Sequence, residues 1–353
     1  MIWADTLDWM NFFEEVALAP YTTLGIGGPA KWFAEAASEA DILEAVQFAR
    51  EQELPLFVLG GGSNLLVSDA GFAGLMVRIG LKGIEQSSDG GIFRVAAGES
   101  WDKFVSQVVD GNYAGIECLA GIPGTVGGTP VQNVGAYGQE VSETILGVRA
   151  FDLKSLEFVE MTGEECGFSY RTSLFNTTER YRFIVTRVDY GLKQGGMPTL
   201  HYADLRRHFQ GWDGAPLLSE VATAVRAIRR SKGMFLVSGD PDCASAGSFF
   251  KNPVVDRVTL KAIAAAVPEG TAIPQYSAGE GKVKLAAAWL MEQAGFAKGY
   301  GDGRVGISSR HTLALVNRGG ATAEDILELS ARIVEGVEER FCVRLEREPV
   351  WVG

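Results

Sequence analysis

From Gly115 to Gly138 the sequence is too rich in glycine to form a helix and too long to be a simple connection. It contains the runs Gly121-Ile-Pro-Gly-Thr-Val-Gly-Gly128 and Gln132-Asn-Val-Gly-Ala-Tyr-Gly138. A loop of this length inside a compact domain is uncommon unless it serves a ligand. A second cluster, Gly60-Gly-Gly-Ser-Asn64, follows the short apolar run 56–59, which predicts a buried strand. The sequence therefore predicts a ligand-lining loop and a further glycine loop at a strand end.

The chain contains unusually many glycines. The 44 glycines among 353 residues are well above the ~7% of typical proteins. They cluster rather than scatter, and close approach of the backbone to a ligand is one cause of such clusters. With 46% hydrophobic and 22% charged residues, the chain is otherwise an ordinary globular sequence with a sizeable core, long enough for two or three domains.

Charge and cysteine usage exclude several classes of protein. The net charge of −12 argues against nucleic-acid or membrane-surface binding, because both need broad cationic faces. The four cysteines have no CxxC spacing and the three histidines do not cluster with them, so we expect no metal site. No apolar run reaches membrane-spanning length, and the first residues lack the basic region of a signal peptide. We expect a cytoplasmic protein with reduced thiols.

The first two thirds of the chain mix strands with amphipathic helices. Ser38-Glu-Ala-Asp41 predicts a capping box for a helix that ends near Glu51, and a second helix is predicted at 101–109. The predicted strands lie at 31–36, 56–59, 75–79, 148–152, 157–161 and 182–190. The opening is therefore predicted to be a small α/β unit with a glycine loop at a strand end, and the middle third is dominated by strands.

The last third of the sequence is mainly helical. We predict helices at 217–231, 256–267, 284–294 and 322–341, with strands at 312–316 and within 343–350. The first of these helices ends in the basic residues Arg226, Arg229, Arg230 and Lys232. Positive charge at a helix C-terminus can be purely structural, so both interpretations stay open for Arg226 and Arg230. Lys232, at the edge of the loop, favours a ligand contact.

A loop of small residues, Cys243-Ala-Ser-Ala-Gly-Ser-Phe-Phe-Lys-Asn-Pro253, presents the hydroxyl of Ser248 beside two aromatic residues. Small neighbours let a flat ligand approach the backbone, and Phe249 and Phe250 are expected to anchor the segment in a core. A stretch of this kind can also be an ordinary turn. Taken alone, this stretch does not decide between a ligand-contacting loop and an ordinary turn.

Six motifs in a fixed order resemble those of the UDP-N-acetylenolpyruvoylglucosamine reductase family. They are Gly60–Asn64, Gly121–Gly128, Asn133-Val-Gly-Ala-Tyr-Gly138, Phe168-Ser-Tyr-Arg-Thr-Ser173, Ala246-Gly-Ser-Phe-Phe-Lys-Asn-Pro253 and Leu345-Glu-Arg-Glu348. The matches extend from about residue 20 to 350. One glycine motif would be weak evidence, but six with the family's spacing are specific.

The resemblance implies an α+β multidomain fold, with FAD-binding domains of the vanillyl-alcohol-oxidase type and a C-terminal substrate-binding domain. The implied domains are residues 1–80 and 81–225, which bind FAD, and 226–342, with the last strand returning to the first domain. The glycine loops replace the Rossmann fingerprint, which this chain lacks, and their backbone N–H groups can meet a pyrophosphate. The implied FAD-binding residues are Gly60, Gly61, Gly62, Ser63, Asn64, Gly121, Ile122, Pro123, Gly124, Thr125, Gly127, Gly128, Asn133, Gly135 and Ala136.

The family's chemistry is a hydride relay from NADPH through FAD to an enolpyruvyl sugar nucleotide. Ser248 matches the serine that protonates C2 of the substrate. Arg171 and Glu348 match the residues that polarise the substrate carboxylate. From the residues alone, Arg171 could form a structural salt bridge and Glu348 could be a solvated charge. Proline follows Glu348 where the family usually has valine, and Glu346, two residues earlier on the same predicted strand face, is a competitor.

The resemblance also implies contacts to the substrate. Tyr202 matches the tyrosine loop of the family's type I branch, which folds over the diphosphate, and Lys232 matches a lysine for the same group. Asn252 and His311 fall where the family contacts substrate, although lone residues of these types are more often structural. The implied partners are NADPH and the UDP-sugar, and we expect a monomer.

Two other functions stay open at this point. The first is an FAD-dependent sugar or alcohol oxidase of the same fold, which would not need Ser248, Arg171 and Glu348 together. The second is a sugar-nucleotide binding protein without catalysis, although all three catalytic positions are filled here.

Overall fold

The computed structural model describes residues 10–279 and 281–353, which form two compact units. Unit 1 comprises the described residues up to Val16, together with 30–61 and 73–229. Unit 2 comprises 17–29, 62–72 and the described residues from Arg230 onward. The N-terminal stretch on which the expectation about a signal peptide rests lies outside the described residues. The three domain boundaries implied by the family resemblance stay a prediction.

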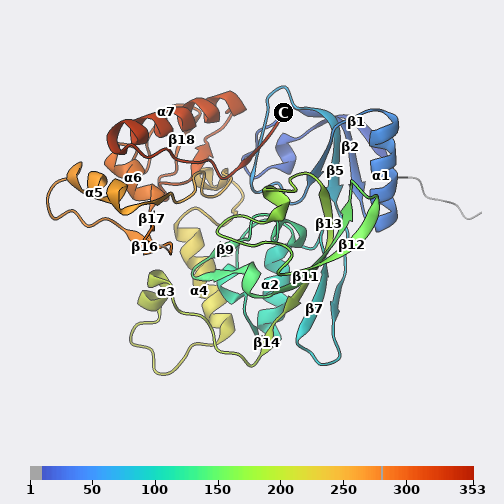
Figure 1. Cartoon of the computed structure of the whole chain (residues 1–353), viewed down its shortest axis with the longest axis horizontal. Helices are drawn as coiled ribbons and strands as arrows, with labels where there is room; N and C mark the ends of the chain where they lie inside the picture. Colours follow the sequence, from blue (N-terminus) through green and yellow to red (C-terminus); the bar gives the residue numbers. More distant parts are fainter. Residues whose placement is uncertain (1–9, 280) are drawn as a thin grey trace, which may run out of the picture. The chain divides into compact units, whose positions relative to one another are not determined.

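Unit 1 is built on two sheets (Figure 1). The first has the order β1-β2-β5-β3, formed by Phe12–Ala17, Pro29–Ala36, Phe72–Ile79 and Leu56–Leu59. The second has the order β12-β11-β13-β7-β6, formed by Glu157–Thr162, Ile145–Asp152, Phe183–Gly191, Ile92–Ala96 and Ile84–Gln86. All strand pairings of this second sheet are antiparallel, whereas in the first sheet β3 pairs with β5 in parallel. Two small pairs complete the unit, β8 (Tyr113–Ala114) with β14 (Lys193–Gln194) and β9 (Gly135–Ala136) with β10 (Gln139–Glu140).

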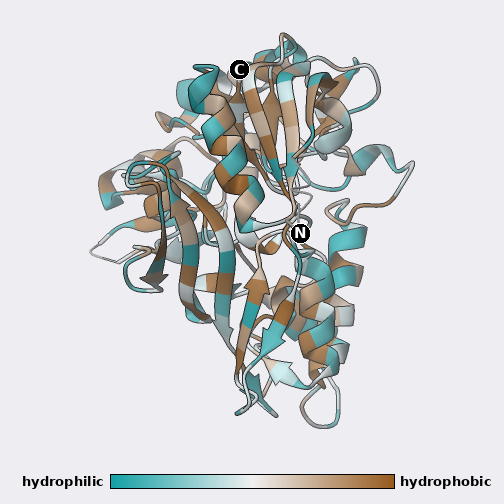
Figure 2. Ribbon diagram, turned by 90° about the vertical axis from the view of Figure 1, so that its right-hand side faces the viewer, coloured by the Kyte–Doolittle hydropathy of each residue, from teal (hydrophilic) through white to brown (hydrophobic). Residues whose placement is uncertain are grey.

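The helices of unit 1 each bury one apolar face. They are α1 (Glu39–Glu51), α2 (Trp101–Asp110), α3 (Ala203–His208) and α4 (Leu218–Ser231). Ser38 and Asp41 form the predicted capping box of α1, which satisfies N–H groups that the first turn leaves unpaired. On α2, Trp101, Phe104, Val105 and Val108 are all buried, which is the i, i+3, i+4, i+7 spacing of a helix on a core. Figure 2 shows hydrophobic residues along one side of several helices.

Unit 2 has its own core of apolar residues, which includes Phe249 and Phe250. Its helices are α5 (Arg257–Ala265), α6 (Ala287–Gln293) and α7 (Ala323–Phe341), and α7 lies beside α6 and β18 (Figure 1). Its strand pairs are β4 (Leu65–Val67) with β20 (Val350–Val352), and β18 (Val305–Ile307) with β19 (Leu315–Asn317). A third sheet has the order β15-β17-β16, formed by Val254–Val255, Val283–Leu285 and Gln275–Ser277.

Within residues 10–279 and 281–353, six short 3-10 turns connect these elements. They are Ala19–Tyr21, Glu117–Leu119, Val126–Gly128, Val141–Glu143, Leu174–Asn176 and Pro241–Cys243. The glycine-rich passage from Gly115 to Gly138 contains only such turns and the short strand β9, so the prediction that it forms no helix is confirmed.

Most predicted elements are confirmed, but several boundaries are wrong. The strands predicted from 75 and from 148 begin earlier, at Phe72 and Ile145. The helix predicted from 284 begins at Ala287, because Val283–Leu285 pair with β15 and β16. The strand predicted from 312 begins at Leu315, since the N–H of Ala314 closes a turn on the carbonyl of His311. The last strand is β20 rather than 343–350, and it pairs in parallel with β4. Within the described residues, every helix is too short or too polar to cross a lipid bilayer.

Candidate functional site

The two glycine loops meet in unit 1. A Cβ placed on Gly61 would lie 2.5 Å from the Cα of Gly124, and one on Gly60 would lie 2.9 Å from Oγ1 of Thr125. Distances this short are incompatible with a side chain at Gly61, because the obstacle is backbone. The structure therefore brings together the residues around Gly60 and Gly124 that were predicted separately from the sequence.

Both polar groups of Gly121 are held by charged side chains from helices. Its N–H donates to Oδ1 of Asp102 on α2 at 2.6 Å, and its carbonyl accepts from Nε of Arg229 on α4 at 2.9 Å. Arg226 forms an ion pair with the same aspartate at 2.7 Å. Arg229 is buried, and this burial lowers the pKa of its guanidinium, which nevertheless stays charged at neutral pH. The start of the glycine loop is thus fixed from two sides.

Several N–H groups of the Gly121–Gly128 loop are already used by the protein. Those of Gly121, Gly127 and Gly128 donate to Asp102, Ala97 and Thr125. Across residues 10–279 and 281–353, no hydrogen bond occupies the N–H groups of Ile122, Gly124 and Thr125. A phosphate at this loop would therefore meet these three N–H groups, which are fewer than the sequence alone suggests.

Arg171 lies against the loop 133–138, which carries the predicted cofactor residues Asn133 and Gly135. It follows Tyr170 at the tip of a tight turn that pairs Ser169 with Thr172, and its φ of +57° is left-handed. Its Nη2 donates to the carbonyl of Gly135 at 2.5 Å, and Nη1 donates to that of Asn133 at 3.4 Å. The guanidinium is thus held by backbone carbonyls of this loop.

Several residues near Arg171 have a left-handed backbone conformation. Asn133 has a φ of +45° and Tyr137 a φ of +50°, so three non-glycine residues of this region adopt a conformation that few side chains favour. Each such residue costs on the order of 1 kcal/mol and persists only where the surrounding structure imposes it. Strain of this kind is typical of ligand sites.

Tyr202 packs on the same loop. It is the N-cap residue of α3, and its ring lies edge-on to that of Tyr137 with the centroids 5.2 Å apart. A Cβ on Gly138 would lie 3.4 Å from the Cβ of His201, so the two segments are in van der Waals contact. Unit 1 thereby brings together Arg171, Tyr202 and the loop 133–138.

The Ser248 loop in unit 2 is held at both of its edges. On one side the N–H of Phe249 donates to the carbonyl of Leu313 at 2.7 Å, and Ser245 pairs with Val316. On the other side Phe250 pairs with Arg347. Gly247, with φ +72°, makes the turn that precedes Ser248. The Ser248 side chain is half-buried, and none of the described residues forms a hydrogen bond with its hydroxyl.

Glu348 lies next to this loop. Its N–H donates to the carbonyl of Phe249, the residue after Ser248, at 2.9 Å. Glu346 instead forms an exposed ion pair with Lys251 at 2.6 Å. The strand predicted for this segment is reduced to the single antiparallel bridge between Arg347 and Phe250, which lies between the two glutamates. Glu348 is half-buried, whereas Glu346 is exposed.

The C-terminal end of the Gly60–Asn64 loop also lies beside Glu348. Nδ2 of Asn64 donates to the carbonyl of Glu348 at 3.2 Å, and the N–H of Val350 donates to the carbonyl of Asn64 at 2.9 Å. Gly62 belongs to the same unit and has a φ of +62°, and a Cβ there would lie 1.8 Å from the carbonyl oxygen of Tyr21. Gly62, Ser63 and Asn64 thus belong to unit 2, whereas Gly60 and Gly61 belong to unit 1.

The remaining predicted substrate residues have structural contacts. Asn252 accepts a hydrogen bond from the N–H of Ala287 at 2.9 Å and so caps the start of α6. Nδ1 of His311 accepts from the N–H of Leu313 at 3.2 Å, within the turn that leads to β19. Lys232 is half-buried just after the end of α4. For Asn252 in particular, the geometry favours the structural interpretation.

The chain is similar to known proteins along nearly its whole length. Residues 240–352 match the family model described as UDP-N-acetylenolpyruvoylglucosamine reductase, C-terminal domain, and residues 30–162 match that of an FAD binding domain. The UDP-N-acetylenolpyruvoylglucosamine reductase of Thermobifida fusca is 45% identical, over 97% of this chain and 98% of the relative. This chain belongs to the UDP-N-acetylenolpyruvoylglucosamine reductase family. The reductase of Streptomyces coelicolor is also 45% identical, over 99% of this chain and 92% of its own length.

Membership of the reductase family confirms the predicted fold class. The crystal structure of the reductase from Thermus caldophilus matches with a TM-score of 0.68 and 28% identity, over 98% of this chain and all of that chain. The chain is an α+β multidomain protein with a vanillyl-alcohol-oxidase-type FAD-binding domain, and it is an FAD-dependent oxidoreductase.

The glycine loops fit the cofactor of this reductase family. FAD carries a pyrophosphate, and the contact between Gly61 and Gly124 leaves backbone rather than side chains facing a ligand. The N–H groups of Ile122, Gly124 and Thr125 would hold the anionic group. In the sequence, Arg229 is one of four basic residues at the end of the helix predicted at 217–231. Its bond to Gly121 cannot be foreseen there, because the two residues lie 108 positions apart.

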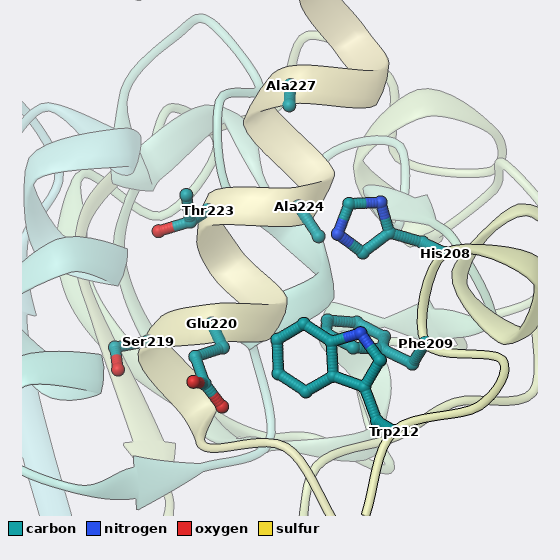
Figure 3. A pocket seen from close by; sticks show the side chains of 8 residues that line it. All are labelled: His208, Phe209, Trp212, Ser219, Glu220, Thr223, Ala224 and Ala227. Atoms are coloured by element: carbon teal, nitrogen blue, oxygen red, sulfur yellow. The ribbon is translucent and has the colours of Figure 1, made fainter.

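A separate pocket of about 280 Å³ lies between α4 and the segment that follows α3 (Figure 3). The rings of His208, Phe209 and Trp212 lie on the side of α4 that carries Ala224. The pocket is also lined by the α4 residues Ser219, Glu220, Thr223 and Ala227. None of the predicted cofactor, substrate or catalytic residues lines it. The site is therefore better located by its loops than by this concavity.

Proposed function

We propose that this chain is an NADPH-dependent reductase of peptidoglycan precursor synthesis. It reduces the enolpyruvyl group of UDP-N-acetylenolpyruvoylglucosamine to the lactyl ether of UDP-N-acetylmuramate. The observation that carries the proposal is the pairing of the Ser248 loop with Glu348 through the Phe249 carbonyl. This pairing places a hydroxyl and a half-buried carboxyl group on neighbouring backbone within one unit.

The reaction adds a hydride to C3 and a proton to C2 of the enolpyruvyl group. FAD, when bound, carries the hydride from NADPH to the substrate. As C3 accepts the hydride, negative charge develops on C2 and the carboxylate. Ser248 then donates its proton to C2, which is feasible for so weak an acid because the developing carbanion is strongly basic.

Arg171, by its positive charge, and Glu348, as a hydrogen-bond donor in its acid form, stabilise the intermediate in this proposal. Arg171 and Glu348 polarise the substrate carboxylate as charge accumulates on it. The Arg171 guanidinium is already oriented by the carbonyls of Asn133 and Gly135, so little reorganisation is needed during the reaction. Arg171 belongs to unit 1 and Glu348 to unit 2, so the proposal assigns roles to residues of both.

The rest of the substrate is assigned to Tyr202 and Lys232, which are proposed to contact the diphosphate. Asn252 and His311 are weaker candidates, because the structure gives each a local structural contact. We further propose that the enzyme acts in the cytoplasm as a monomer, and that the boundaries 1–80, 81–225 and 226–342 delimit its domains.

The purified protein is expected to be yellow, because FAD stays bound. NADPH should bleach the flavin absorbance, and the enolpyruvyl sugar nucleotide should then restore it under anaerobic conditions. The measurement is an absorbance spectrum before NADPH, after NADPH and after substrate. A colourless protein that FAD cannot reconstitute contradicts the proposal. Flavin reduction by a sugar or alcohol instead of NADPH would indicate an oxidase, and substrate binding without reoxidation would indicate an inactive binding protein.

Exchange of each glutamate for glutamine distinguishes Glu348 from Glu346. Glu348→Gln is expected to slow flavin reoxidation by the substrate about a hundredfold, because an amide N–H is a far weaker acid than a carboxyl O–H and polarises the negatively charged intermediate less. Glu346→Gln should change that rate less than about twofold, since an exposed ion pair contributes little. Stopped-flow absorbance measures both rates. If Glu346→Gln gives the larger effect, the assignment of the two residues is reversed.

A further inference from the structure

A fully buried carboxylate in unit 1 has no role in the reaction described so far. Glu117 lies in the short turn Glu117–Leu119. Its carboxylate accepts hydrogen bonds from the N–H groups of Gly115 and Thr199 and from Nε2 of Gln139, each at 2.8 Å. A buried charge is costly unless such donors satisfy it. The three donors come from three different segments, so one carboxylate ties these segments together.

Thr199 is held by more than this one bond. Sγ of Cys118 donates to its carbonyl at 3.2 Å, and Nε2 of Gln139 donates to its Oγ1, also at 3.2 Å. Oε1 of Gln139 accepts from the N–H of Cys118 at 2.8 Å. Glu117, Cys118, Gln139 and Thr199 therefore form a closed network, here called the Glu117 clamp. The N–H, carbonyl and hydroxyl groups of Thr199 are all bound within it.

The Glu117 clamp lies at the base of the Tyr202 segment. Thr199 is three residues before Tyr202, and residues 201–203 are exposed until Leu205 is buried again. Gln139 is two residues after Tyr137, whose ring packs on that of Tyr202. The clamp thus fixes the backbone beside both partners of this aromatic contact. Without it, the exposed segment would have its next buried anchor only at Leu205.

We propose that Glu117 is a positioning residue for substrate, acting through Thr199 on the segment that carries Tyr202. The inference rests on the proposed function, because it requires Tyr202 to contact the substrate. Glu117 does not itself touch a reacting group. Its effect is to reduce the number of conformations of residues 199–203, so that less freedom is lost when the sugar nucleotide binds.

Glu117→Gln keeps the shape of the side chain but turns one acceptor into a donor. Whichever way the new amide is oriented, its NH₂ group faces an N–H donor, so at least one clamp bond is lost. We expect KM for the enolpyruvyl substrate to rise about tenfold, with flavin reduction by NADPH unchanged. Amide hydrogen exchange in residues 199–203 should become about tenfold faster, because local opening is easier.

A matched control separates this role from general stabilisation. Asp152 is another buried carboxylate of unit 1, at the end of β11, and it accepts hydrogen bonds from the N–H of Lys154 and from Arg182. Asp152→Asn should lower the stability of the protein while leaving both the substrate KM and exchange at 199–203 at wild-type values. Equal changes in the Asp152→Asn protein would overturn the inference.

The two readouts distinguish the inference from the function on which it rests. If the wild-type protein shows no turnover of the substrate, the proposed function fails, whatever the exchange data show. If turnover is normal and Glu117→Gln changes neither KM nor exchange, the inference alone fails. Faster exchange with an unchanged KM also overturns it, and so does a loss of bound FAD, which would assign Glu117 to the glycine loop instead.

A coupling experiment and a milder variant complete the test. In a Tyr202→Phe background, Glu117→Gln should raise KM less than about twofold further, because both changes act on one contact. Additive effects would contradict the route through Tyr202.

If Glu117→Gln fails to fold, Cys118→Ala removes the bond to the Thr199 carbonyl, and Cys118→Ser keeps a donor there. KM should rise for the alanine variant only, and equal values for the two variants would overturn the proposal.

Discussion

Ser248→Ala is expected to slow reduction of the enolpyruvyl substrate about a thousandfold, while flavin reduction by NADPH proceeds at its normal rate. Only the second half of the reaction needs the proton that this hydroxyl supplies. In the structure the Ser248 side chain is half-buried and forms no hydrogen bond with any described residue, so removal of its oxygen breaks no contact that supports the fold. Single-turnover absorbance measurements follow the two halves separately.

Two further variants show whether the proton or the loop is responsible. Ser245→Ala removes the acceptor of the Gly247 N–H at 3.3 Å, which shapes the loop without supplying the proton, and should cost less than about tenfold. Ser248→Cys keeps a proton donor and should recover part of the rate lost in Ser248→Ala. Equal slowing of both half-reactions by Ser248→Ala would mean that the residue has a structural role only.

The parts of the site that could be predicted from the sequence are those whose constraint is local. Ser38 and Asp41 form the capping box that their spacing predicts, and the run from Gly121 to Gly128 is free of helix as its composition requires. The assignment of the glycine loops Gly60–Asn64 and Gly121–Gly128 to FAD rests on the order of the six motifs along the chain, and no single motif is sufficient for it. Neither inference needed knowledge of which distant residues meet.

The parts that the sequence did not reveal depend on contacts between distant residues. Glu117 and Thr199 are 82 positions apart, and a lone glutamate near a glycine loop gives no sign that it is buried. The start of α6 was misplaced for a similar reason, since the apolar spacing near Leu285 fits a helix until its pairing with β16 is known. Tertiary pairing overrides local preference in such cases.

The choice between Glu346 and Glu348 shows the same limit at a catalytic position. Their spacing predicts a common face only if the segment is a strand. In the structure, Lys251 pairs with Glu346 and the Phe249 carbonyl binds the Glu348 N–H, so the two carboxylates have different surroundings. The partner of each glutamate comes from the Ser248 loop, about a hundred positions earlier in the chain.

Gly61→Ala is expected to abolish FAD retention and to lower the midpoint of thermal unfolding. The added methyl group would lie 2.5 Å from the Cα of Gly124 and 2.9 Å from its carbonyl carbon, and backbone cannot move aside as a flexible side chain can. The two glycine loops must therefore separate, which costs about 1–3 kcal/mol or more and removes the surface proposed for the pyrophosphate. The flavin-to-protein absorbance ratio after gel filtration, together with thermal unfolding, measures both effects.

Gly91→Ala is the matched control for this substitution. A Cβ at Gly91 would meet only the carbonyl oxygen of Leu192 at 3.6 Å, an ordinary van der Waals distance, in the same unit. Both variants add one methyl group to a glycine, so they differ mainly in what that group meets. Gly91→Ala should retain FAD at the wild-type ratio. If Gly61→Ala also retains it, the close approach of the two loops is not needed for the cofactor, and the pyrophosphate must be held by other residues.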